Sequence, residues 1–468
     1  MMSVQFVFLW SDALLWLLLI AACGLGVVSL RVAHLRAGWQ RLGKNGVAMA
    51  MVTWLTVFLI IGFLDSIHYR LPLPKTETDT EQRYSVEVLS VLDALTEKLH
   101  SRYEKTYSAP LATRLYVMET VETATHVERV YPRLVHGGAH LGEQESDRAG
   151  DVLVRIAWAL SSALLIWLAV AAAITHCVQR KERGTSFRST SRRIWRGETP
   201  FAWRGVLLAL VPLLLVAFPI LFLAGDYHVF GTDKVGQDVL YQVLKSIRTA
   251  LVIGLVTTFV MLPLAVLLGI VAGYFRGWVD DAIQYIYTVL NAVPGVLLIA
   301  AAVLMMQVVI DTHPQWFSTA AERADLRLVA LCAILGMTSW TSLARLLRGE
   351  TLKLRELEYI AAARAFGVSS RRILLRHILP NLMHIVVIAL VMDFSSLVLA
   401  EAVLSYVGIG VDPTMTSFGG MINNARMELS REPAVWWSLA AAFTFMLTLV
   451  LSANLFADAV RDAFDPRQ

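Results

Sequence analysis

Apolar residues form long runs along this chain, and shorter polar segments separate them. Nine runs approach or exceed the roughly 20 residues that an α-helix needs to cross a bilayer. These runs lie at about residues 11–30, 47–64, 152–177, 206–224, 249–273, 283–310, 327–346, 381–404 and 436–457. The pattern predicts an all-α polytopic membrane protein with nine spans.

The composition agrees with this prediction. Of 468 residues, 56% are hydrophobic and 17% are charged, and the mean hydropathy is +0.59. The net charge of +4 is small, and the basic residues flank the apolar runs. We therefore expect contact with membrane lipid and no nucleic-acid binding.

Lysine and arginine concentrate in three of the polar segments, which fixes an expected orientation. The segments are the first loop, with Arg31, Arg36, Arg41 and Lys44, and residues 178–205 and 347–380. Because cytoplasmic loops carry an excess of basic residues, we expect all three in the cytoplasm. The N-terminus is then outside and the C-terminus inside. Segment 65–151, which is more acidic than basic, falls outside.

Segment 65–151 shows two apolar stripes at helical spacing. The first holds Val88, Val91, Leu92, Leu95 and Leu99, and the second, after Pro110, holds Leu111, Leu115, Met118, Val121 and Thr125. Two helices packed as a hairpin would bury both stripes. We expect a small helical domain that starts at the stiff Leu71–Pro74 exit and is bounded by Gly137, Gly138 and Gly142 near its end.

The same segment contains His100, His126, His136 and His140. Neither a cysteine nor a carboxylate completes a recognisable metal-ligand spacing with them. We interpret them as surface histidines and predict no metal site.

The runs and loops divide the chain into five parts. These are two spans in 1–64, the external insert 65–151, a third span in 152–178, a basic cytoplasmic linker 179–205, and a six-span unit 206–468. We expect the linker to be flexible and solvated at the membrane surface, with residues 1–178 forming a separate three-span unit.

Residues 350–380 are polar and helix-forming although apolar runs flank them. Leu352, Leu357 and Ile360 begin an apolar stripe, and three alanines follow at 361–363. Gly367 is placed to end one short helix, Ser369 or Ser370 could cap a second, and Pro380 marks entry to the next span. Such a segment offers a rigid surface to a soluble partner. An amphipathic helix lying on lipid is the alternative.

The spacing of this segment resembles the coupling loop of bacterial ABC importer permeases. That family has Glu-Ala-Ala, three residues, Gly, nine residues and Ile-x-Leu-Pro. Here Ala361 stands at the Glu position and His377 at the Ile position, while the other motif positions match. The resemblance implies an ATPase-coupling loop that includes Glu358, Ala361, Ala362, Ala363, Gly367, Leu379 and Pro380.

Four further blocks resemble the C-type permeases of dipeptide, oligopeptide and nickel importers. They lie at residues 230–240, 272–280, 400–410 and 454–467. The likeness covers about 206–468 and implies a six-helix core of the type I importer kind, preceded by an unusual three-helix extension. The first block, near the outer mouth, contributes Gly231, Thr232, Asp233, Gly236 and Asp238.

The resemblance also implies the partners. They are a second homologous permease, two cytoplasmic ATPase subunits and an extracytoplasmic binding protein, all at a bacterial inner membrane. No Gly-x-x-x-x-Gly-Lys-Ser/Thr motif occurs in the chain, so we expect no bound cofactor, no enzyme activity, and ATP and Mg²⁺ used by the partners. Peptides are the expected cargo, with nickel, opines and peptide antibiotics as alternatives.

Four residues in or after the eighth run are candidates for the translocation path or gate, namely Asp393, Glu401, Gly408 and Gly410. Ionisable groups within spans are expensive and usually face a cavity. Asp393 could contact a substrate amine or accept a hydrogen bond from Ser395 or Ser396. Two other functions stay open at this point: an ion-coupled secondary transporter using Asp393 and Glu401, and a membrane sensor or assembly factor with 65–151 as its input domain.

Overall fold

The computed structural model describes residues 5–31, 33–73, 83–122, 127–141, 147–181, 186–317 and 319–464. Within these ranges eight helices are long and apolar enough to cross a membrane. They are Gly46–Asp65, Arg148–Lys181, Trp203–Leu223, Val239–Phe275, Gly295–Thr312, Ala320–Arg355, Ser370–Tyr406 and Trp437–Phe464. The first predicted span is also helical, as α1 (Trp10–Arg31), with a shorter apolar part. The prediction of a helical polytopic protein is confirmed.

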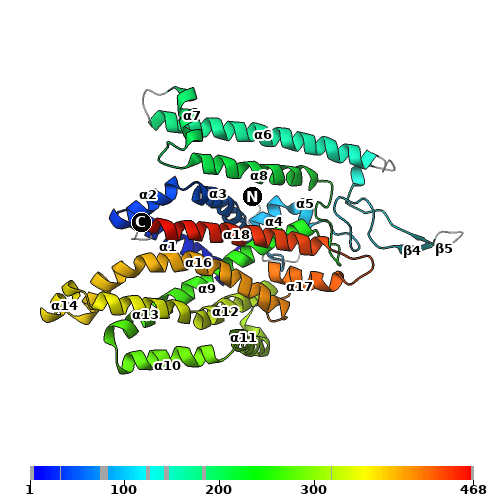
Figure 1. Ribbon diagram of the computed structural model, residues 1–468. Helices are drawn as coiled ribbons and strands as arrows, with labels where there is room; N and C mark the ends of the chain where they lie inside the picture. Colours follow the sequence, from blue (N-terminus) through cyan, green and yellow to red (C-terminus); the bar gives the residue numbers. More distant parts are fainter. Residues whose placement is uncertain are drawn as a thin grey trace. The chain divides into compact units, whose positions relative to one another are not determined.

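Figure 1 shows the helices, coloured along the sequence. The chain folds as two compact units, and each contains segments from both halves of the sequence. The first unit comprises Met1–Val7, Ala37–Thr249 and Thr416–Ala459, and the second comprises Phe8–Arg36, Ala250–Met415 and Val460–Gln468. The predicted separation of 1–178 from 206–468 does not match this division. Helix α1 belongs with the helices after residue 250, because Ser11 near its start bonds to the buried carboxylate of Asp325.

In the first unit, three long helices pack together. Helix α8 (Trp203–Leu223) lies between α3 (Gly46–Asp65) and α6 (Arg148–Lys181). Close approach of α8 to α3 needs a glycine, because a Cβ at Gly205 would lie 2.2 Å from the carbonyl oxygen of Gly46. Besides the short helices of the insert, this unit contains most of α2 (Ala33–Lys44), α7 (Phe187–Arg196), the start of α9 (Val239–Phe275), α17 (Phe418–Glu428) and most of α18 (Trp437–Phe464).

The insert, residues 65–151, is mostly irregular rather than a helical hairpin. Its elements are β2 (His68–Arg70), β3 (Leu89–Ser90), α4 (Val91–Leu95), α5 (Glu97–His100), β4 (Glu119–Glu122), β5 (Val127–Val130) and η1 (Ala139–Leu141). Strands β2 and β3 join β1 (Gln5–Val7) in an antiparallel sheet of order β1-β2-β3, and β4 and β5 form a hairpin. The first predicted helix survives as two short turns, with Leu92 and Leu99 buried and Leu95 exposed.

The second predicted helix of the insert is wrong. The backbone N–H of Leu111 donates to the carbonyl oxygen of His228 at 2.9 Å, and that of Leu115 donates to Pro132 at 2.8 Å. Leu111 also has a positive φ of 57°, which an α-helix does not allow. Partners distant in sequence therefore take the hydrogen bonds that a helix would have used. Of the residues named for this domain, Pro74, Thr125 and Gly142 lie outside the described residues.

The predicted flexible linker 179–205 also contains a helix. Helix α6 continues to Lys181, and α7 occupies Phe187–Arg196 before α8 begins at Trp203. The Ser186 side chain accepts a hydrogen bond from the backbone N–H of Ser189, which caps α7, and Gly197 ends it with φ of 76°. Residues 182–185, within the predicted flexible part, lie outside the described residues.

The second unit contains the remaining helices. They are α1, the rest of α9, α10 (Trp278–Ala292), α11 (Gly295–Thr312), η3 (Pro314–Trp316), α12 (Ala320–Ser339), α13 (Thr341–Arg355), α14 (Glu358–Ala365), α15 (Ser370–Ile373), the π-helical turn η4 (Leu374–Ile378) and α16 (Leu379–Tyr406). The predicted continuous span 283–310 is wrong, because extended Val293 before Pro294 separates α10 from α11.

Candidate functional site

Two short turns carry most of the residues that the sequence singled out, and each precedes a long helix. The first is residues 230–240, called here the Gly-Thr-Asp block, at the start of α9. The second is residues 358–380, called here the elbow, which contains α14, α15, η4 and the first two residues of α16. They belong to different units, so each is described separately.

The Gly-Thr-Asp block is a tight turn that caps α9. One carboxylate oxygen of Asp233 accepts hydrogen bonds from the backbone N–H groups of Val235 and Gln237, both at 2.9 Å. Asp238 accepts one from the backbone N–H of Leu240 at 2.8 Å, in the first turn of the helix. These bonds satisfy donors that a helix start would otherwise leave unpaired. Both aspartates therefore have a structural role.

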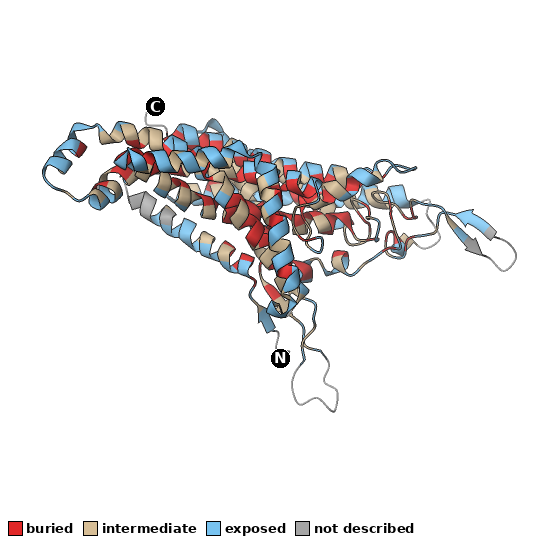
Figure 2. Ribbon diagram, turned by 90° about the horizontal axis from the view of Figure 1, so that it is seen from below, coloured by how far each residue is buried: buried red, intermediate tan, exposed pale blue. Residues whose placement is uncertain are grey.

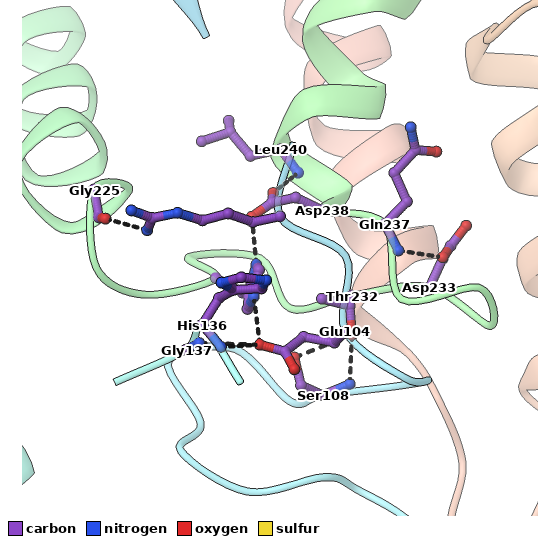
Figure 3. A network of polar contacts seen from close by, with 12 residues as sticks. Glu104, Ser108, His136, Gly137, Gly225, Thr232, Asp233, Gln237, Asp238 and Leu240 are labelled. Carbon is purple, nitrogen blue, oxygen red and sulfur yellow. Dashed lines mark hydrogen bonds and ion pairs between the residues drawn. The ribbon is translucent and has the colours of Figure 1, made fainter. Parts of the chain in front are cut away.

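Residues of the insert close around this block (Figure 3). The backbone N–H of Ser108 donates to the buried hydroxyl of Thr232 at 2.7 Å, and that hydroxyl donates to the carbonyl oxygen of Thr106 at 2.9 Å. The backbone N–H of Glu104 donates to the carbonyl of Gly236 at 2.9 Å. The insert and the block thus form one hydrogen-bonded structure.

Two glycines of the block are required by this close approach. Gly231 and Gly236 have φ of 71° and 76°, the left-handed region. A Cβ at Gly236 would lie 1.7 Å from the carbonyl oxygen of Glu104, and one at Gly231 would lie 2.4 Å from that of Ser108. Both positions therefore need glycine for its φ and for the space that a side chain would fill.

A buried ionic triad joins the insert to α9. His228 places Nδ1 2.7 Å from a carboxylate oxygen of Asp238 and Nε2 3.3 Å from one of Glu104. All three side chains are almost fully buried. Burial by itself lowers the pKa of His228, but hydrogen bonds to Asp238 and Glu104 outweigh it and raise this pKa to about 9. His228 is therefore a cation between two carboxylates at neutral pH.

Glu104 is also held by backbone donors. Its carboxylate accepts hydrogen bonds from the N–H groups of Val135, His136 and Gly137, at 2.9, 2.8 and 3.0 Å. Burial alone raises its pKa, but His228 and these three N–H groups outweigh burial and lower the pKa to about 2. Glu104 thus joins its own loop and the loop at residues 135–137 to His228.

A second ionic cluster secures the first half of the insert. Lys245 of α9 lies 2.7 Å from Asp65, at the end of α3, and 3.0 Å from Asp93 of α4. Ser90 donates to Asp65 at 2.6 Å and forms a capping box with Asp93. Burial favours a raised pKa for Asp93, but the Lys245 charge and hydrogen bonds from Ser90, Lys245 and Tyr241 together outweigh it and lower the pKa. The insert is therefore clamped to α9 at two places.

The sequence did not identify Glu104, His228, Asp93 or Lys245 as functional. His228 lies three residues before Gly231, and that proximity is the one local signal. The insert residues carry no recognisable motif, because their partners are more than a hundred residues away. Of the four histidines that the sequence analysis named in the insert, His136 contributes its backbone to the Glu104 site, His140 lies 2.9 Å from Asp151, His100 lies 3.4 Å from Glu87, and His126 is outside the described residues.

The elbow is held by apolar side chains. Ile360, Ile373 and Ile378 are fully buried and pack in one cluster with residues of α9, α13 and α16. The two short helices and the helix end at Gly367 are confirmed, because the N–H groups of Gly367 and Val368 donate to Arg364 and Ala363, both at 3.0 Å. Gly367 has φ of 75°. Ser369 precedes the second helix without a side-chain cap, and Pro380 lies in the first turn of α16.

Much of the remaining elbow is exposed, as the burial colouring of Figure 2 shows, although Ala363 and Leu379 also pack against this cluster. Glu358, Ala361, Ala362, Gly367 and Pro380 are exposed, and Ala363 and Leu379 are half-buried. Phe366, which the sequence did not single out, is 86% exposed at the end of the first short helix. The end of the first short helix therefore presents an aromatic ring close to the small side chains of Ala361 and Ala362.

The base of the elbow is braced by a further ion pair. The guanidinium of Arg348 donates to both carboxylate oxygens of Asp280, at 2.6 and 2.7 Å, and so joins α13 to α10. This two-bond geometry fixes the relative orientation of the two groups. The elbow therefore projects from a rigid support.

Three of the candidate gate residues lie at the end of α16 and in the turn after it, and the fourth, Asp393, lies within α16. Glu401 is buried and accepts a hydrogen bond from Ser405 at 2.6 Å, and a Cβ at Gly410 would lie 1.8 Å from that Ser405 oxygen. Gly408 lies between them with φ of 85°. Asp393 lies two turns earlier in α16. Ser396 donates to its backbone carbonyl at 2.8 Å, and the buried Ser395 hydroxyl has no partner among the described residues, so the predicted bond to the carboxylate is not seen.

One residue beside this turn was missed. The buried carboxylate of Asp412 accepts hydrogen bonds from the hydroxyl of Thr414 at 2.7 Å and from Arg327 of α12 at 2.5 Å. Burial alone raises the pKa of Asp412, but Thr414 and Arg327 outweigh it and lower the pKa. Arg327 therefore holds the turn that contains Gly410.

The C-terminal half of the chain is similar to known proteins. Residues 265–468 match the model of the family described as binding-protein-dependent transport system inner membrane component. The chain is 31% identical over 242 residues to an oligopeptide transport system permease protein of Mycobacterium bovis, covering 52% of this chain and 77% of the relative. It is 35% identical over 242 residues to a glutathione transport system permease protein of Pectobacterium atrosepticum, covering 51% and 73%. A dipeptide transport system permease protein of Lactococcus lactis is 29% identical over 242 residues, covering 52% and 64%.

Proposed function

The chain belongs to the family of binding-protein-dependent transport system inner membrane components, and we propose that it forms half of the translocation pathway of an ATP-driven importer for peptides or related small solutes. It is a multi-pass membrane protein. The relatives are named as oligopeptide, glutathione and dipeptide permeases, and these names support a peptide-like cargo. Family membership favours this function over the ion-coupled transporter and the membrane sensor.

The observation that carries the proposal is the construction of the elbow. Three buried isoleucines fix it to the helices behind it, while Ala361, Ala362 and Phe366 remain exposed. A segment whose base is fixed by packing and whose tip is exposed can transmit a movement of a bound partner to α16. We assign the elbow as the coupling segment for a separate ATPase subunit, which binds ATP and Mg²⁺.

The remaining partners follow from this assignment. A complete pathway needs a second permease, which we propose to be a homologue, so that the pair is a heterodimer with two ATPases. The three basic loops support a cytoplasmic elbow and C-terminus, with the N-terminus outside. The insert and the Gly-Thr-Asp block then lie on the outer side. There the two ionic clamps hold the insert fixed against α9, beside the proposed docking side of the extracytoplasmic binding protein.

The turn with Glu401, Gly408 and Gly410 is proposed as an outer gate. Glu401 binds Ser405, Gly410 packs against the same hydroxyl, and Arg327 holds Asp412. These contacts keep the turn in one conformation. Opening of the gate would have to break the Glu401–Ser405 and Arg327–Asp412 hydrogen bonds. Asp393, part-buried in α16, is proposed to line the pathway and to contact a substrate amine.

The coupling assignment is tested by Ala362→Glu in the complete transporter. Ala362 is exposed, so we expect normal abundance in the membrane and loss of substrate-stimulated uptake, because the bulky carboxylate blocks close docking. Ala362→Ser, which keeps a small side chain, is the control and is expected to transport. Uptake of labelled peptide and membrane abundance are measured together.

Cross-linking gives a second, direct test. With Cys23 and Cys177 replaced by serine, a cysteine at Ala362 is expected to cross-link to the ATPase subunit, whereas one at Ser189 of α7 is not. Normal uptake by Ala362→Glu, together with no captured ATPase at position 362, contradicts the assignment.

A further inference from the structure

Helix α7 joins two helices that are long and apolar enough to cross the membrane, α6 and α8. It has defined ends, capped by Ser186 and by left-handed Gly197, and it contacts both neighbours. In Figure 1 it lies across α6 near the Lys181 end. Because α6 ends and α8 begins beside it, α7 lies at the level where the membrane meets water.

One face of α7 is apolar and has two different parts. Thr190 and Ile194 are buried and hold the helix on its neighbours. Phe187 and Trp195 lie at the borders of the same face and are 46% and 41% exposed. The Trp195 ring lies 6.5 Å from the ring of Trp167 in α6, which continues the apolar surface of the span. Exposed aromatic rings at the edge of a span are typical of the bilayer interface.

The opposite face of α7 is basic. Arg188, Arg192 and Arg196 repeat every four residues and are exposed, and Arg193 lies next to them. The helix contains no acidic residue, so no carboxylate of α7 pairs with Arg188, Arg192 or Arg196. Arginines beside aromatic rings can bury their stems in the apolar layer and keep the charge among headgroups.

We propose that α7 is an interfacial helix that binds anionic phospholipid headgroups through Arg188, Arg192 and Arg196, with Phe187 and Trp195 inserted in the apolar layer. The charge of the face, the aromatic border and the continuity with two membrane helices all favour a bilayer as its occupant. An acidic soluble protein would match the arginines, but it would leave the two rings in water. The inference depends on membrane embedding and is independent of the transported substrate.

The experiment uses the full-length chain in lipid nanodiscs. Cys23 and Cys177 are replaced by serine, and buried Cys332 is retained. S191C, between the two aromatic positions, carries an environment-sensitive dye. Quenching of this dye by lipid-borne nitroxide is compared in discs of purely zwitterionic lipid and in discs that also contain phosphatidylglycerol.

We expect much stronger quenching in the anionic discs, and weaker quenching at high salt, where surface charge is screened. The variant R188Q/R192Q/R196Q should lower partitioning of the dye into lipid about tenfold or more. The matched control R371Q/R372Q/R376Q removes the same number of exposed arginines from the elbow and should leave the signal unchanged.

Equal quenching in the two kinds of disc overturns the proposal, and so does a signal insensitive to the α7 variant. Dye that is exposed to water in both discs but shielded in native membranes indicates a protein partner and also overturns it. If the triple variant does not fold, the salt dependence of the unsubstituted helix decides. Peptide uptake is not part of this readout, so failure here is distinct from failure of the transport assignment.

Discussion

The Gly-Thr-Asp block and the elbow are built on the same local plan but held in opposite ways. Each is a short turn before a long helix, and each contains a left-handed glycine, Gly236 with φ of 76° and Gly367 with φ of 75°. Around Gly236 the insert leaves no space, since a Cβ would lie 1.7 Å from a carbonyl oxygen. Around Gly367 nothing lies within 4 Å.

The two turns also differ in the kind of side chain that they bury. The Gly-Thr-Asp block buries charges, with His228 between Glu104 and Asp238, and its hydrogen bonds are made within the chain. The elbow buries three isoleucines and leaves its small and aromatic residues exposed. The first turn is completed by the chain's own insert. In the second turn the chain buries the base and leaves the tip exposed, as expected of a surface that binds another protein.

The largest difference between the two turns should appear at glycine. We expect Gly236→Ala to destabilise the first unit by more than about 5 kcal/mol, because the backbone of the insert must move and the Glu104 bonds are lost. Thermal unfolding of the solubilised chain and protease sensitivity of the insert measure this effect.

The control for this variant is Gly197→Ala. Gly197 has the same φ of 76° and no atom within 4 Å of the Cβ position, so it isolates the cost of the backbone conformation, about 1–2 kcal/mol. Equal losses at the two positions contradict the close packing of the insert on the block.

The second prediction concerns pH and the triad. The pKa of His228 is raised from 6.5 to about 9, so its contribution of about 3 kcal/mol is complete below pH 6.5 and is lost as pH rises through 9. The pKa of Glu104 is lowered from 4.5 to about 2, so its contribution is present above pH 4.5 and lost as pH falls through 2. Stability of the insert should therefore fall between pH 6.5 and 9.

His228→Gln tests this slope. We expect the variant to lose about 3 kcal/mol at pH 6.5 and to show little further change up to pH 9, as followed by unfolding at each pH. His140→Gln, which removes a partly exposed pair with Asp151, should cost at most about 1 kcal/mol. A wild-type slope that persists in His228→Gln assigns the pH dependence to another group.

The same contrast explains what the sequence could predict. The two short helices of the elbow depend on neighbours within a few residues, so alanine propensity, Gly367 and Pro380 were sufficient to predict them and the entry to α16. The packing of the elbow on α9 had no such local signal. The spans were predictable because an uninterrupted apolar run has few alternatives. The break at Pro294 has a local signal as well, since proline disfavours helix at the residue before it.

The insert could not be predicted in this way. Leu111, Leu115 and Met118 have helical spacing, but their segment pairs with residues around Pro132 and His228. Partners outside the segment decide its conformation, Pro132 within the insert and His228 more than a hundred residues away, and hydrophobic periodicity contains no information about them. The sites of Glu104 and Lys245 were missed for the same reason. Helix α7 was also missed, because residues 179–205 were interpreted as a flexible linker.

A third prediction compares the base of the elbow with its tip. Ile360 is fully buried in the apolar cluster, so Ile360→Ala should destabilise the second unit by about 2 kcal/mol through lost packing. The elbow should also become mobile, with faster amide exchange in residues 358–380 and weaker coupling of ATP hydrolysis to uptake. Ile360→Val, which keeps most of the volume, is the control. Unchanged exchange in the elbow contradicts its anchoring by Ile360.

The smallest effect on stability, and the sharpest test of the comparison, is expected at Phe366. Its ring is 86% exposed, so Phe366→Ala should change the unfolding free energy by less than about 0.5 kcal/mol. Because an aromatic anchor at the centre of an interface can dominate binding, the same change should weaken association with the ATPase by about 2 kcal/mol and lower peptide uptake. Co-purification of the ATPase and uptake are measured beside Tm. Unaltered association shows that the elbow tip is not the docking point, whereas a large loss of stability shows that the elbow is closed by its own chain, as the Gly-Thr-Asp block is.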